Sequence, residues 1–200
     1  LQDRNGLPVT PFRTDDWPGA PANNVKYPYV LRTDCSFSDC RKYRYSLLHR
    51  WDELFERRRA IFVCLNPSTA DENQLDPTLR RIKAFSKRLG ASEVIMLNIF
   101  AYRATDPKEM MAAKDPIGPE NDEHIQAALS EAYELNEGQL DVIGGWGNHG
   151  LHMERQDAFL ELLAPYRKWP KLRIACLGKN ANQTPKHPLY IAANRDFETL

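Results

Sequence analysis

The chain has 200 residues, which suits one domain with an ordinary hydrophobic core. Apolar residues make up 42% and charged residues 27%, as in a globular protein. The charges of the 27 basic and 27 acidic side chains cancel. This argues against a protein that binds nucleic acid non-specifically through a net positive charge, whereas a local basic patch is compatible with a net charge of zero. No apolar run approaches the roughly 20 residues that span a bilayer. No signal-peptide core follows Leu1, so we expect a cytoplasmic protein with no membrane partner.

The pattern of the four cysteines favours free thiols in a reducing compartment. Cys64 and Cys176 lie inside apolar, strand-like runs, where a buried thiol is the ordinary interpretation. Cys35 and Cys40 have no second close pair beside them, so neither a metal centre nor a disulfide framework is favoured. The chain also lacks a Gly-rich dinucleotide fingerprint and a phosphate loop. We therefore expect no cofactor.

In chain order, the first segment is rich in proline and polar residues. Residues 1–26 are expected to form an irregular arm, and residues 27–200 a single α/β domain. Two aromatic and β-branched stretches at the start of that domain resemble strands, namely Tyr27–Thr33 and Tyr43–Trp51.

From residue 60 onward, short apolar runs alternate with amphipathic segments. Strands are predicted at Ala60–Leu65, Glu93–Ile99, Leu140–Gly144 and Leu172–Leu177. Helices are predicted from the Asp76 cap and Pro77 to Gly90, after Asp106–Pro107, over Pro119–Leu135, and over residues 152–166. This order predicts a three-layer α/β/α sandwich with a short, mainly parallel, four-stranded central sheet.

In open α/β sheets, ligands bind beyond the carboxyl ends of the strands. The residues that follow the four predicted strands are mostly neutral hydrogen-bonding groups and aromatic rings, which suit a planar polar ligand such as a base or nucleoside. Each also has a purely structural interpretation. The asparagines could cap a turn or a strand, and Arg103 could form a structural ion pair. Trp146 could be a core ring, and His187 could be a surface or structural histidine in a loop. The candidate residues are Asn66, Pro67, Ser68, Thr69, Asn98, Phe100, Tyr102, Arg103, Trp146, Gly147, His187 and Pro188.

Other combinations of polar residues are weaker. His149 and His152 have no carboxylate at a convincing metal-ligand spacing, so no metal is expected. Ser68 lacks the elbow motif of serine hydrolases. The run Arg57–Arg59 could contact phosphates, but such a run is more typical of a solvated face.

Over about residues 35–191, the sequence resembles DUF1643, a bacterial and phage family of unknown function. The resemblance implies no activity. It rests on Arg44-Tyr45-Ser46-Leu47, Leu65-Asn66-Pro67-Ser68-Thr69-Ala70, Asp76-Pro77-Thr78, Asn98-Ile99-Phe100-Ala101, Trp146-Gly147 and His187-Pro188-Leu189-Tyr190.

More distantly, the strand-end motifs resemble those of the uracil-DNA glycosylase superfamily. Asn66-Pro67 is similar to its first motif, Asn98 to the residue that reads the base, and His187-Pro188 to its last motif. Three features depart from that pattern: Leu189 stands where the superfamily has serine, no tyrosine follows Pro67, and no obvious stacking phenylalanine follows the first motif. Uracil specificity is therefore not implied.

The superfamily resemblance implies a glycosylase-like fold and an N-glycosidase that removes a base from DNA or a nucleoside. Asn66 and His187 would be catalytic, with Asn66 orienting water and His187 hydrogen-bonding the departing base, while Asn98 would read the base edge. The alternative is a non-catalytic module that binds a nucleotide or single-stranded nucleic acid and stacks bases on Trp146 and Tyr102. DNA, a nucleotide or a nucleoside is thus the expected partner.

Overall fold

The structure is a computed structural model that describes residues 34–51, 57–68, 77–168 and 171–200. The described residues fall within one compact unit, Leu31–Leu200. The expected arm over residues 1–26, the strand over residues 27–33, and the roles of Thr69 and Asp76 all lie outside the described residues. Among the described residues, no helix has the length and apolar character needed to cross a membrane.

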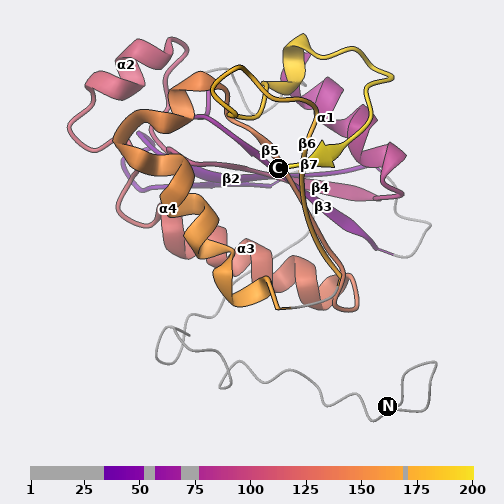
Figure 1. The fold of residues 1–200 in the computed structure, drawn as a ribbon. Coiled ribbons are helices and arrows are strands. Elements are labelled where there is room, and N and C mark those ends of the chain that lie inside the picture. Colours follow the sequence, from indigo (N-terminus) through magenta and orange to yellow (C-terminus); the bar gives the residue numbers. More distant parts are fainter. Residues whose placement is uncertain (1–33, 52–56, 69–76, 169–170) are drawn as a thin grey trace, which may run out of the picture. The chain divides into compact units, whose positions relative to one another are not determined.

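A seven-stranded mixed sheet with the order β1-β2-β4-β3-β5-β6-β7 forms the middle of this unit (Figure 1). The four strands in its centre, β4-β3-β5-β6, are parallel to one another and correspond to the four predicted apolar runs. The α/β class is therefore confirmed, but the expected four-stranded sheet is too small, because antiparallel strands extend both edges. The strands are β1 (Asp34–Phe37), β2 (Arg44–Arg50), β3 (Arg59–Cys64), β4 (Glu93–Asn98), β5 (Leu140–Gly145), β6 (Leu172–Cys176) and β7 (Glu198–Thr199).

Of the three additional strands, β2 corresponds to the strand predicted over Tyr43–Trp51, whereas β1 and β7 are short and carry little apolar pattern. β1 pairs with β2, and the two-residue strand β7 pairs with the end of β6 through Cys176 and Glu198. An exposed strand edge presents unpaired backbone N–H and C=O groups, which a short polar segment can satisfy without contributing an apolar face. Such strands depend on the partner edge, so their own side-chain pattern does not predict them.

Helices cover both faces of the sheet, giving three layers (Figure 1). On one face, α1 packs Ile82 and Phe85 against side chains of β3 and β4. On the other face, α3 and α4 contribute Leu129 and Phe159 to a second apolar cluster. The helices are α1 (Pro77–Arg88), α2 (Pro107–Ala112), α3 (Asn121–Leu135) and α4 (Arg155–Leu162).

The helix expected over residues 152–166 is shorter than predicted. A 3₁₀ segment, Asn148–Glu154, precedes α4, and both Met153 and Glu154 have a φ of 54°. This left-handed conformation is unfavourable for residues with a side chain and cannot continue a right-handed helix. The chain therefore turns before α4 begins, which keeps Asn148 and its neighbours close to the end of β5.

Because β3, β4, β5 and β6 are parallel, their carboxyl ends meet at one edge of the sheet. Cys64, Asn98, Gly145 and Cys176 are the last residues of these strands. The four loops that follow consequently approach one another, although long stretches of sequence separate them.

Candidate functional site

A cavity of about 500 Å³ opens at this edge of the sheet. Its volume falls within the range of about 300–1,000 Å³ that is typical of small-molecule sites. Residues from all four strand-end loops line it, together with Thr78 in the first turn of α1. Of the residues predicted from the sequence, those that line it are Asn66, Ser68, Asn98, Trp146, Gly147 and His187.

Other predicted residues lie elsewhere. Phe100 is fully buried in the apolar cluster beneath α3 and α4. Arg103 donates a hydrogen bond to the carbonyl of Arg41 and lies 5.0 Å over the Phe37 ring, so its guanidinium is directed toward β1. Tyr102 contacts Tyr43, with 5.9 Å between the ring centroids. Pro67 and Pro188 also lie outside the cavity lining.

The Asn66 side chain is held by the loop that follows β4. Its Nδ2 donates hydrogen bonds to the carbonyl oxygens of Ala104, at 2.8 Å, and of Pro67, at 3.2 Å. A third carbonyl, that of Tyr102, lies 3.5 Å from the same nitrogen. Because three carbonyl acceptors surround the amide nitrogen, the orientation of this amide is determined. Asn66 can therefore offer its Oδ1, an acceptor, to a ligand or a water molecule in the cavity.

Asn98, at the end of β4, carries a buried donor without a partner. The residue is 2% exposed and lines the cavity, and its Nδ2 has no hydrogen-bond partner among the described residues. A buried unsatisfied N–H costs about 1–3 kcal/mol. A ligand acceptor or a bound water that reached this nitrogen would recover that energy, so Asn98 is suited to recognising an oxygen or ring nitrogen.

The His187 ring is oriented by its own turn. Its Nδ1 accepts a hydrogen bond from the backbone N–H of Leu189, at 3.3 Å, at the start of the 3₁₀ turn Pro188–Tyr190. In a neutral imidazole only one ring nitrogen carries the proton. An Nδ1 that accepts therefore leaves the proton on Nε2, which makes His187 a hydrogen-bond donor at that atom.

The residues after β5 have structural roles as well as lining the cavity. The Trp146 indole is buried, donates from Nε1 to Gln156 at 2.9 Å, and packs edge-on against Phe159. The ring thus belongs to the core and is not available for stacking on a base. Gly147 has a φ of 70°, which favours glycine, and its N–H donates to the carbonyl of Pro185 at 2.8 Å. This bond ties the loop after β5 to the loop that carries His187.

Gly145 sets the distance between these two loops, which yields a prediction. A Cβ at Gly145 would lie 2.7 Å from Cδ of Pro188. Gly145→Ala is therefore expected to lower the free energy of unfolding by about 1–3 kcal/mol, measured by urea denaturation. In a Pro188→Ala background the same change should cost clearly less, since the clashing ring is gone. An equal cost in both backgrounds would contradict the contact.

Sequence reasoning missed several residues of the site, of which Arg44 is the most informative. This buried arginine begins β2 and is the only Asp, Glu, Lys or Arg side chain among the described residues that line the cavity. The prediction considered only residues that follow parallel strands. Because β2 runs antiparallel to β4, its first residue lies at the same edge as the end of β4. Further lining residues with hydrogen-bonding side chains outside the predicted set are Thr78, Thr105, Asn148, His149, Asn180 and Tyr190.

The protein-family model described as "Protein of unknown function (DUF1643)" matches residues 44–189. The chain belongs to the DUF1643 family. The match begins at Arg44 and includes β2 to β6 and His187, so every residue that lines the cavity of this DUF1643 protein, except Tyr190, lies inside the family's region. No curated protein and no solved structure matches the chain. The likeness to the uracil-DNA glycosylase superfamily, in fold and in motifs, therefore stays a prediction.

Proposed function

We propose that the cavity binds a nucleobase and that this DUF1643 protein hydrolyses the N-glycosidic bond between that base and its sugar. The observation that carries the proposal is the set of three polar groups on one cavity. Asn66 can present an acceptor, while Asn98 and His187 can present donors, and backbone contacts orient two of the three groups. Such neutral, directional groups suit a flat heterocycle with carbonyl or ring-nitrogen acceptors.

The reaction requires those groups in particular roles. As the C–N bond breaks, both of its electrons leave with the base, and the oxygen of a water molecule bonds to the anomeric carbon. Donors placed where negative charge grows on the base lower the barrier. The Nε2–H of His187 and the Nδ2–H of Asn98 would serve as these donors. Asn66 Oδ1 would accept a hydrogen bond from the water and hold it, and one proton of that water ends on the base.

One observation favours a second candidate, a non-catalytic module that binds a nucleotide or single-stranded nucleic acid. The described residues that line the cavity include no carboxylate, and a neutral asparagine is a poor general base. Catalysis through Asn66 should therefore be slow compared with catalysis through a carboxylate. A binding module would use the same donors to hold a base without cleaving it.

The two candidates are separated by incubating the protein with nucleosides, nucleotides and oligonucleotides that carry ordinary and modified bases, and measuring free base and binding. Asn98→Ala is expected to reduce base release from the preferred substrate about tenfold to hundredfold, since it removes a buried donor. Asn194→Ala, which changes an exposed asparagine outside the cavity lining, is the matched control and should have no effect.

Binding of a nucleotide without release of free base from any substrate would support the binding module. Neither binding nor release across the panel would contradict both candidates.

A further inference from the structure

A second cluster of charged residues lies at the opposite end of the same strands. Arg59 begins β3, Glu93 begins β4, and Arg50 ends the antiparallel strand β2, where it pairs with Glu93. β3 contains 6 residues. At about 3.3 Å per residue, a strand of that length separates this cluster from the strand-end cavity by roughly 20 Å. The cluster is therefore distinct from the proposed base site.

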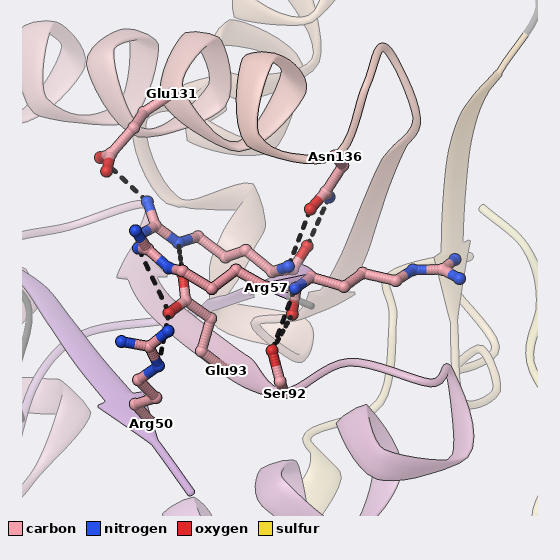
Figure 2. Close-up of polar contacts among 8 residues, drawn as sticks. Arg50, Arg57, Ser92, Glu93, Glu131 and Asn136 are labelled. Carbon is pink, nitrogen blue, oxygen red and sulfur yellow. Dashed lines mark hydrogen bonds and ion pairs between the residues drawn. The ribbon is translucent and has the colours of Figure 1, made fainter. Parts of the chain in front are cut away.

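Three guanidinium groups converge on one fully buried carboxylate (Figure 2). Arg59 Nε lies 2.6 Å from Glu93 Oε1, Arg57 Nη2 lies 3.4 Å from the same oxygen, and Arg50 Nε lies 3.7 Å from Oε2. One guanidinium in this geometry would neutralise the carboxylate. The other two guanidinium groups therefore add positive charge that the single charge of Glu93 does not balance.

Among the described residues, neighbouring carboxylates do not balance the three guanidinium charges. Glu131 lies 2.9 Å from Arg59 Nη1, which leaves three arginines against two carboxylates. Next to this cluster, Asp141 forms ion pairs with two arginines, with Arg58 at 3.1 Å and with Arg173 at 2.7 Å. The described residues at this end of the sheet thus carry more guanidinium groups than carboxylates in direct contact with them.

Each of the three arginines also has a buried nitrogen without a hydrogen-bond partner among the described residues. These atoms are Nε of Arg50, Nε of Arg57 and Nη2 of Arg59. Arg59 is 1% exposed, whereas the side chains of Arg50 and Arg57 are 17% and 28% exposed. Unmade hydrogen bonds of charged donors are costly. A ligand from solvent would therefore contact the partly exposed side chains of Arg50 and Arg57, next to the buried guanidinium group of Arg59.

The backbone that carries these arginines is held in place (Figure 2). Asn136 bonds the backbone of Arg59 twice, accepting from its N–H and donating to its carbonyl, both at 2.8 Å. The Ser92 hydroxyl accepts from the N–H of Arg58 at 3.0 Å. The backbone at Arg58 and Arg59 is therefore fixed before any ligand arrives, which lowers the entropy cost of binding.

We propose that Arg50, Arg57 and Arg59 form a binding site for a phosphate group, either inorganic phosphate or a phosphate monoester. Guanidinium forks match the geometry of phosphate oxygens, and a dianion beside the partly exposed side chains of Arg50 and Arg57 would offset the positive charge that the described carboxylates leave. The site goes beyond the proposed base-binding function and does not depend on it.

The test is a calorimetric titration of the full chain with inorganic phosphate, with chloride adjusted to keep the ionic strength constant. The wild-type protein is expected to bind phosphate saturably. Arg57→Gln should weaken the affinity at least about tenfold, because it removes a charged donor while Arg59 still neutralises Glu93. Arg58→Gln is the matched control, since it makes the same change at the next residue, and Asp141 keeps Arg173. It should leave the affinity nearly unchanged.

Three outcomes would overturn the proposal: no saturable binding by the wild type, equal effects of Arg57→Gln and Arg58→Gln, or loss of binding in Asn98→Ala, which would place the phosphate in the strand-end cavity. If circular dichroism shows that Arg57→Gln does not fold, Arg50→Gln replaces it, with the same expected loss. Competition by a nucleoside monophosphate, but not by the nucleoside, would identify a monoester as the ligand. Without such competition, the ligand would be the free anion.

Discussion

Glu93→Gln is expected to lower the free energy of unfolding by about 3–5 kcal/mol, the usual cost of removing one partner from a buried ion pair. The substitution keeps the shape of the side chain but removes its charge. Arg50, Arg57 and Arg59 would then face one another around a neutral amide, and Glu131 would be the one carboxylate among the described residues still paired with any of them. Arg59 is the most affected, because it is almost completely buried.

Urea denaturation in a buffer free of phosphate and sulfate measures this effect. Glu131→Gln provides the control, since Glu131 is partly exposed and its ion pair among the described residues is with Arg59, so its loss should cost no more than about 1 kcal/mol. A similarly small loss of stability in both variants would show that the charge of Glu93 is not what stabilises the three arginines in the folded protein.

The second large effect is expected for His187→Ala, which should slow base release by about 10²- to 10³-fold, the typical cost of removing one donor to a developing anion. Since Nδ1 accepts the backbone N–H of Leu189, the ring presents Nε2–H as a neutral donor. Alanine removes that donor. The rate is measured at saturating substrate, so that a change in binding alone does not enter.

His149→Ala is the matched control for His187→Ala. His149 is a histidine that lines the same cavity, but it is exposed and has no assigned role in the proposed reaction. Its loss should change the rate only a few-fold. Equal losses in the two variants would contradict a specific role for His187, and an unchanged rate in His187→Ala would remove it from the reaction.

The central strands were predictable because a strand buried on both faces must be apolar throughout, as Ile61 to Val63 and Val142 to Ile143 are. The edge strands were less so. β7 has only two residues, and its pairing depends on the free edge of β6, a property of the partner strand. The shortened α4 follows from the left-handed backbone at Met153 and Glu154, which an amphipathic pattern does not reveal.

The candidate site shows the same division. Asn66, Asn98 and His187 could be grouped in advance, because parallel strands bring their carboxyl ends to one edge. Arg44 could not, since its place in the cavity depends on β2 pairing antiparallel with β4. Phe100 and Trp146 also follow strands, yet the packing of α3 and α4 draws their rings into the core.

By itself, the sequence determined the α/β class, the four central strands and the edge at which their polar residues gather, because alternation and burial leave a local pattern. Only the tertiary structure decided which way each side chain faces. The run Arg57–Arg59 was predicted to be a solvated face, but Arg59 is buried against Glu93 and Glu131. Burying a charged side chain is costly unless groups elsewhere in the fold pair with it, and here those groups are distant in the sequence, so no local pattern predicts the burial.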